Sequence, residues 1–145
     1  MVSELVLATR NIHKGQELQA LLSDLGIRIR TLAEFPYAPE VEEDGETCEA
    51  NAIKKAVTIA KATGLVAVAD DTGLEVEALS GRPGVYAARY AGESATYEDN
   101  CRKLLQELAG VPASRRTAKF ITVAAIAQPS GEVETVRGEL SGVIT

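Results

Sequence analysis

The amino-acid sequence predicts an α/β fold in which a mixed central sheet is flanked by helices. In the first half of the chain, apolar runs of strand length alternate with amphipathic stretches of helix length. Two long β-type runs then follow one another around a Pro-Ser-Gly turn at 129–131, which predicts an antiparallel hairpin. No repeat or low-complexity linker divides the 145 residues, so one domain over 1–145 is expected.

The first predicted elements are a strand, a helix and a strand. The run 4–9 (ELVLAT) has the length and apolar content of a short buried strand. The stretch 13–26 (HKGQELQALLSDLG) predicts an amphipathic helix that ends at Gly26. Its apolar stripe follows three- and four-residue spacings and consists of Leu18, Leu21, Leu22 and Leu25. The segment 27–32 (IRIRTL) alternates with period two and predicts a half-buried strand.

A second helix is predicted at about 47–63, where Gly64 stops it. Its inner face is expected to consist of Ala52, Ala56, Ile59 and Ala60. The next strand is 65–69 (LVAVA), and the Pro-Gly pair at 83–84 breaks the chain after it.

A third helix is predicted at about 96–109, because Thr96 and Asp99 have the spacing of an N-terminal capping pair. The hairpin then occupies 117–140. Strands that alternate with helices early and pair antiparallel late predict a mixed sheet.

The composition argues against general nucleic-acid or membrane-surface binding. Fifteen Lys+Arg against 21 Asp+Glu leave a net charge of −6, whereas those partners require a basic face. A small polyanion bound at one local basic spot, with a divalent metal, remains compatible with this charge. Cys48 and Cys101 lack metal-ligand spacing and fit a reduced protein. With no signal peptide or membrane-length apolar run, a soluble cytoplasmic protein is expected.

The first candidate site is 9–14 (TRNIHK), between the first strand and the first helix. Backbone N–H groups and the helix dipole favour an anion at such a junction. Thr9 and Asn11 can donate hydrogen bonds, and Lys14 adds a point charge of the kind that binds phosphate. The alternative is that Asn11 only caps the helix and Lys14 is solvated. His13 is the only histidine, and a single loop histidine is a weak candidate base.

The second candidate site is the acidic approach to the second helix, where six carboxylates lie between Glu40 and Glu49. The helix dipole accounts for some of them. Their density is greater than that role requires, and packed acidic groups repel one another unless a cation, or Lys54 and Lys55, relieves them. Oxygen ligands of this type suit Mg²⁺.

The third candidate site is the pair Asp70 and Asp71 at the end of the predicted strand. Ligands bind near the carboxyl ends of strands in open α/β sheets. The pair would jointly hold a metal, or one member would act as a general base. The alternative is a simple turn, in which Asp and Gly are common. Aspartic proteases share the triplet at 71–73, but their folds are all-β, whereas predicted helices flank it here.

In this order the three sites resemble the inosine triphosphate pyrophosphatase family, from Val6 to the C-terminus. The stretch 8–14 (ATRNIHK) resembles the family's phosphate-gripping Thr/Ser-x-Asn-x-x-Lys. The stretch 42–56 (EEDGETCEANAIKKA) resembles its acidic segment, and 69–92 (ADDTGLEVEALSGRPGVYAARYAG) resembles its most specific motif. The resemblance implies a nucleotide-pyrophosphatase architecture, here without its C-terminal part.

The resemblance also implies an activity and its residues. The reaction would be Mg²⁺-dependent hydrolysis of deaminated purine nucleoside triphosphates (ITP, dITP and XTP) to the monophosphate and pyrophosphate. Asp71 would be the proton acceptor and a metal ligand, and Glu43, with Glu42 as the less favoured neighbour, would bind metal. The implied substrate-binding residues are Thr9, Arg10, Asn11, Ile12, His13, Lys14, Asn51, Lys55 and Thr72. A cytoplasmic homodimer without nucleic-acid or membrane partners is implied as well.

Three departures from the family pattern qualify these expectations. Ala50 stands where the family often has an acidic residue, and Thr72 replaces the usual Ser but keeps the hydroxyl. The sequence ends with 138–145 (GELSGVIT), before the family's Gly-Phe-Gly-Tyr-Asp-Pro segment and its later Lys and Ser-His-Arg. Weak turnover with little base preference is therefore expected, with uncovered apolar surface. The alternatives are a catalytically silent metal- or phosphate-binding module and a related pyrophosphatase with another base preference.

Overall fold

The computed structural model describes residues 3–145, which form two compact units. The first unit contains the chain up to Asp70 together with Val123–Val136. The second contains Asp71–Thr122 and Arg137–Thr145. Each unit is described by itself.

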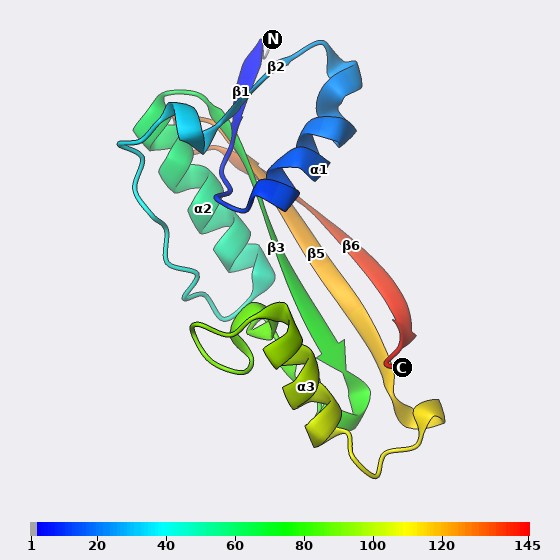
Figure 1. Cartoon of the computed structure of the whole chain (residues 1–145). Helices are drawn as coiled ribbons and strands as arrows, with labels where there is room; N and C mark the ends of the chain where they lie inside the picture. Colours follow the sequence, from blue (N-terminus) through cyan, green and yellow to red (C-terminus); the bar gives the residue numbers. More distant parts are fainter. Residues whose placement is uncertain (1–2) are drawn as a thin grey trace. The chain divides into compact units, whose positions relative to one another are not determined.

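The predicted mixed sheet is confirmed, with the strand order β2-β1-β3-β5-β6 and with β4 paired to β3 outside this path. The strands are β1 (Glu4–Leu7), β2 (Arg28–Thr31), β3 (Val66–Val76), β4 (Pro83–Gly84), β5 (Thr117–Ala127) and β6 (Val133–Val143). β1 pairs in parallel with β2 and β3, whereas β4 pairs antiparallel with β3. The helices are α1 (Ile12–Leu22), α2 (Cys48–Thr63) and α3 (Tyr97–Glu107), as Figure 1 shows.

In the first unit, α1 and α2 lie in the connections that parallel pairing of β1 with β2 and β3 requires. The hydroxyl of Thr47 caps α2 by accepting a hydrogen bond from the backbone of Ala50, and Gly64 ends the helix in the left-handed conformation with φ 72°. The inner face of α2 is as predicted. Its four residues, each no more than 1% exposed, are Ala52, Ala56, Ile59 and Ala60.

The packing of α1 differs from the prediction. No residue of this helix is buried. Leu18 and Leu22 are half-buried, but Leu21 is 72% exposed and Leu25 is 58% exposed. The four-leucine inner stripe is therefore wrong for Leu21 and Leu25. The α-helix ends at Leu22 and continues as a 3₁₀ turn over Ser23–Leu25. A 3₁₀ turn advances by a larger angle per residue, so Leu25 rotates away from the line of Leu18 and Leu22.

The second unit has its own apolar core. Its buried centre is formed by Val76, Leu79, Leu104 and Leu108, and half-buried side chains including Leu74, Val111 and Ile144 pack against it. Thr96 and Asp99 form the predicted capping box at the start of α3. The predicted hairpin is also present as β5 and β6.

The strand β3 is longer than predicted and contains Asp70 and Asp71 within it. The alternative interpretation of a simple turn at this pair is therefore wrong. The reason is non-local: β3 continues beyond Val68, where its pairing with β1 ends, with β5 as its other neighbour in the sheet, and β4 pairs with it at Leu74 and Glu75. Successive side chains of a strand point to opposite faces. The two carboxylates consequently lie on opposite faces of β3, so the hypothesis of one shared carboxylate pair is wrong too.

The strand β6 is the edge of the sheet opposite β2. Apart from Val133, all of its residues are exposed. They include Val136 at 73%, Leu140 at 69% and Val143 at 51% exposed. Uncovered apolar surface was expected, and β6 provides it. Among residues 3–145, no helix combines the length and apolarity that a membrane span requires.

Candidate functional site

The site in the first unit is assembled at the carboxyl ends of β1 and of the first part of β3. Leu7 is paired with Val68, and the backbone N–H of Ala8 donates to the carbonyl of Val68 at 2.8 Å. The chain leaves β1 at this point and enters α1, while β3 continues to Asp70. The polar loop before α1 is thereby tied to the strand that contains Asp70.

Hydrogen bonds within this loop define the start of α1. The hydroxyl of Thr9 accepts from the backbone N–H of Asn11 at 3.1 Å. Oδ1 of Asn11 accepts from the backbone N–H groups of His13 and Lys14 at 3.0 and 3.2 Å. Asn11 is therefore the helix cap, as the alternative interpretation held. An anion at this helix start would be met by the amide nitrogen of Asn11, because the oxygen already serves the helix.

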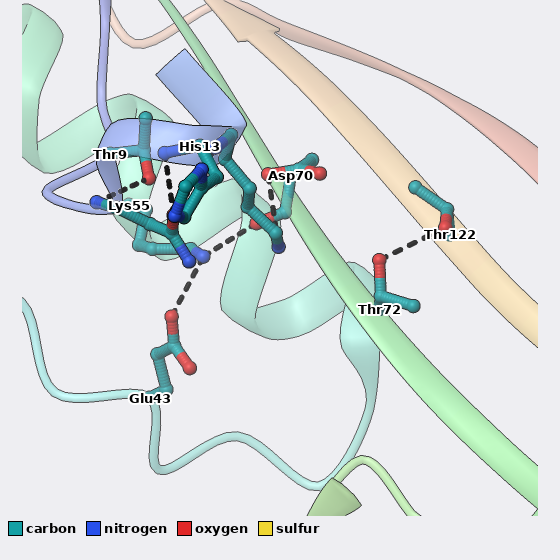
Figure 2. A network of polar contacts seen from close by, with 9 residues as sticks. Thr9, His13, Glu43, Lys55, Asp70, Thr72 and Thr122 are labelled. Carbon is teal, nitrogen blue, oxygen red and sulfur yellow. Dashed lines mark hydrogen bonds and ion pairs between the residues drawn. The ribbon is translucent and has the colours of Figure 1, made fainter. Parts of the chain in front are cut away.

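Lys14 is not simply solvated. Its Nζ lies 3.3 Å from Oδ1 of Asp70, and the two side chains are 32% and 13% exposed. Figure 2 shows Asp70 on β3 close to the residues at the start of α1. The ion pair fixes the ammonium group of Lys14 at the end of the strand.

Lys55 brings a second ammonium group to the same residue from α2. Its Nζ donates to the backbone carbonyl of Asp70 at 2.5 Å and to Oε1 of Glu43 at 2.8 Å. The Lys55 side chain is only 12% exposed. Figure 2 shows Lys55 between Glu43 and the strand. Two positive charges from two different helices thus contact one residue, Asp70.

Two lysines of α2 offset the repulsion between carboxylates of the acidic segment. This was one of the two predicted possibilities, and a bound cation was the other. Lys54 Nζ lies 2.7 Å from Oδ1 of Asp44, and this hydrogen bond is the main reason that the pKa of Asp44 is lowered. Lys55 pairs with Glu43 in the same way. Glu43 is half-buried, whereas Glu42 is exposed. Burial and the lysine contact therefore distinguish Glu43 from its neighbour.

Asn51 holds the acidic segment to α2. Its side chain is 1% exposed, and its Oδ1 accepts from the backbone N–H of Gly45 at 2.7 Å. A Cβ at residue 45 would lie 2.7 Å from the same oxygen, so only glycine fits there without a shift. The structure thus places Asn51, which was expected to bind substrate, as the support of the loop that contains Glu43.

Three other predicted substrate-binding residues, Arg10, Ile12 and His13, lie at or just before the start of α1. Nη2 of Arg10 donates to the carbonyl of Ala38 at 2.9 Å. Ile12 is 74% exposed, and His13 is exposed as well. The contacts of these three residues do not join them to the two lysines.

In the second unit, Asp71 is 6% exposed and lies on the buried face of β3. Asp71 and Asn51 are the only buried polar residues among residues 3–145. The hydroxyl groups of Thr72 and Thr122 lie 3.0 Å apart and form a hydrogen bond, also visible in Figure 2. A carboxylate on a buried strand face lowers the stability of the fold. Proteins therefore contain buried carboxylates mainly at functional sites.

Sequence reasoning missed the role of Asp70. The pair Asp70–Asp71 was recognised, but only Asp71 was assigned a function through the resemblance. The available signal was the strand period: adjacent residues of a strand serve opposite faces. Had β3 been extended through the pair, two separate roles would have been expected.

Comparisons with known proteins agree with this architecture. The chain is 52% identical over 143 residues to a dITP/XTP pyrophosphatase of Geobacter sulfurreducens, which covers 99% of the chain and 72% of that relative. A dITP/XTP pyrophosphatase of Desulforamulus reducens is 52% identical over 141 residues, covering 97% of the chain and 70% of the relative.

A solved HAM1 protein structure from Coxiella burnetii superimposes with a TM-score of 0.88 at 41% identity. This match covers 99% of the chain and 73% of the solved one. The Ham1 family profile matches residues 5–145, and we conclude that the chain belongs to the Ham1 family.

Proposed function

We propose that the chain hydrolyses deaminated purine nucleoside triphosphates (ITP, dITP and XTP) to the monophosphate and pyrophosphate. The observation that supports this most directly is the convergence of Lys14 and Lys55 on Asp70 at the strand ends. The two relatives are dITP/XTP pyrophosphatases, and their names suggest the substrate class. The proposed setting is the cytoplasm, and a homodimer stays a prediction.

The first task of such a site is to bind a polyanion although the chain has a net charge of −6. Lys14 and Lys55 concentrate positive charge locally, and the start of α1 adds backbone N–H groups and the positive end of a helix dipole. Thr9, Asn11 and His13 belong to the loop that forms this helix start. We assign triphosphate binding to this part of the first unit, together with the hydroxyl of Thr72 from β3.

The second task is to activate water and stabilise the charge that develops on phosphate. Asp71 is the proposed proton acceptor, because a buried carboxylate has few structural reasons to lie on this strand face. Glu43, Asp71 and, less favourably, Glu42 are the proposed Mg²⁺ ligands. Magnesium commonly uses one or two carboxylates with substrate phosphates and water. Bound Mg²⁺ would neutralise phosphate oxygens during attack.

The test is pyrophosphate release from ITP, XTP, GTP and ATP by the wild-type chain and by Asp71→Asn, with and without Mg²⁺. We expect turnover to require Mg²⁺ and to fall by several orders of magnitude in Asp71→Asn, as when one member of a catalytic triad is removed. Glu40→Gln, at an exposed acidic residue, is the control and should keep wild-type turnover.

Retention of more than about a tenth of wild-type turnover in Asp71→Asn would contradict the assignment. Saturable binding of triphosphate without turnover would favour the alternative of a catalytically silent binding module. Faster turnover of GTP or ATP than of ITP and XTP would favour a related pyrophosphatase with another base preference. Circular dichroism of each variant excludes unfolding as the cause.

A further inference from the structure

We propose that Asp70 is a positioning residue for the phosphate site: its carboxylate holds Lys14 and its backbone carbonyl holds Lys55. This inference builds on the proposed function, because it assigns both lysines to one polyphosphate ligand. It concerns only the first unit, in which all three residues lie.

The contact between Asp70 and Lys14 attracts the ammonium group without using its hydrogen-bond donors. Nζ of Lys14 lies 3.3 Å from Oδ1 of Asp70. This oxygen is nevertheless buried and has no hydrogen bond of acceptable geometry from residues 3–145. An ammonium group has three N–H donors. Lys14 is therefore held beside Asp70 by charge, and its ammonium group can donate hydrogen bonds to phosphate oxygens.

The contact between Asp70 and Lys55 is of a different kind. Nζ of Lys55 donates to the main-chain carbonyl of Asp70, and Glu43 fixes the same ammonium group from the other side. This bond does not depend on the side chain at position 70. A substitution there should disturb Lys14 and spare Lys55, which gives the inference an internal control.

Charge balance explains why a carboxylate belongs in a site for anions. Two ammonium groups that contact the same residue repel each other, and the Asp70 carboxylate offsets that repulsion before a ligand arrives. Two cations held this close suit the neighbouring charges of a polyphosphate. The position of Asp70 on the face of β3 opposite Asp71 separates this role from the proposed proton acceptor.

The experiment is a double-mutant cycle on the binding of inorganic tripolyphosphate, measured by calorimetry without Mg²⁺ at one fixed ionic strength. The variants are Asp70→Asn, Lys14→Met, Lys55→Met, and each lysine change combined with Asp70→Asn. In the wild-type background we expect Lys14→Met to weaken binding about tenfold or more. In the Asp70→Asn background the same change should weaken binding no more than about threefold. Lys55→Met should weaken tripolyphosphate binding by the same factor in both backgrounds.

Asp70→Asn alone should weaken binding about threefold, roughly half of the lysine effect on a logarithmic scale. The direction is diagnostic, because simple removal of a negative charge from an anion site would strengthen binding. Unchanged or tighter binding of tripolyphosphate by Asp70→Asn would overturn the inference. It would also be overturned if Lys14→Met weakened binding by the same factor in the wild-type and Asp70→Asn backgrounds. A reduced cost of Lys55→Met in the Asp70→Asn background would also overturn it, because the substitution would then have disrupted the whole site.

A second variant and an assay of ITP hydrolysis separate the possible outcomes. If Asp70→Asn does not fold, the cycle is run with Asp70→Glu. The carboxylate is displaced in this variant, so Lys14→Met should again weaken binding less than it does in the wild-type background. If the wild-type chain binds tripolyphosphate but does not hydrolyse ITP, the proposed function fails and the cycle still decides the role of Asp70. If the wild-type chain does not bind tripolyphosphate, the inference about Asp70 is wrong, and the proposed function is decided separately by pyrophosphate release in the presence of Mg²⁺.

Discussion

Replacement of Lys55 by Met should cost much more stability than replacement of its neighbour Lys54. Both lysines lie on α2 and both form short ion pairs, at 2.8 Å to Glu43 and 2.7 Å to Asp44. Their burial differs: Lys55 is 12% exposed, whereas Lys54 is 42% exposed and its partner Asp44 is 65% exposed. Lys and Met have similar helix propensities, so the two substitutions compare the contacts alone.

The magnitude follows from that difference in burial. Lys55 makes two hydrogen bonds with a charged donor, each worth about 1.5–3 kcal/mol when the partner stays buried. Two effects make the expected loss smaller than the sum of these two values. Water can hydrate Glu43, which is 35% exposed, after its partner is removed, and the Met variant avoids the free-energy penalty of desolvating an ammonium group. We therefore expect Lys55→Met to lower the free energy of unfolding by about 2 kcal/mol. The exposed pair of Lys54 with Asp44 should contribute much less, because water and salt screen it.

The assay is urea unfolding followed by far-ultraviolet circular dichroism, because the chain has no tryptophan. The midpoint should fall clearly for Lys55→Met and little for Lys54→Met, with the slope of the transition unchanged in both. Equal losses for the two variants, or the larger loss for Lys54→Met, would refute the argument from burial.

Three other substitutions test separate parts of the structure. Gly45→Ala should lower stability by about 1–3 kcal/mol in thermal unfolding, because the new Cβ would lie 2.7 Å from Asn51 Oδ1; an unchanged melting temperature would contradict this close approach. Leu108→Ala, at a fully buried residue of the second unit, should cost about 2–5 kcal/mol by urea midpoint, and a loss below about 1 kcal/mol would show that the core is not as packed as described. Burial, and then the hydrogen bond to Glu107, raises the pKa of Tyr90 from 10.0 to about 12. The fold therefore favours the neutral phenol, and this contribution to stability is present below pH 10 and lost as the pH rises from 10 towards 12. Tyr90→Phe should remove that part of the pH dependence in alkaline unfolding, and identical profiles for both proteins would contradict it.

Local signals predicted much of the fold. The stop at Gly64 and the capping box of Thr96 with Asp99 lie where the sequence predicted them, and α2 begins at Cys48, next to the predicted start at about 47. These signals are reliable because the side chain and the backbone groups that it satisfies are only a few residues apart. The hairpin of β5 and β6 was predictable for the same reason.

The parts that could not be predicted depend on distant partners. The extension of β3 through Asp70 occurs in a sheet where β5, more than forty residues later in the chain, is the neighbour of β3, and no local pattern specifies that pairing. The loop 9–14 was recognised as an anion site, but the ion pair of Lys14 with Asp70 joins residues from α1 and β3. No spacing in the sequence encodes that contact. The burial of Asn51 under Gly45 was likewise outside the reach of pattern analysis.

The two aspartates of β3 are neighbours in sequence but cannot replace each other, which places a constraint on insertions and deletions. Removal of one residue between Val66 and Ala69 would move the second aspartate to the place that faces Lys14, and Thr72 to the buried place. An added residue would bury the first aspartate and leave an alanine opposite Lys14. In both cases the gene would still encode Asp-Asp, yet one of the two places, beside Lys14 or at the buried position of Asp71, would have lost its acid. Selection should therefore act on the number of residues that precede the pair in β3 as strongly as on the pair itself.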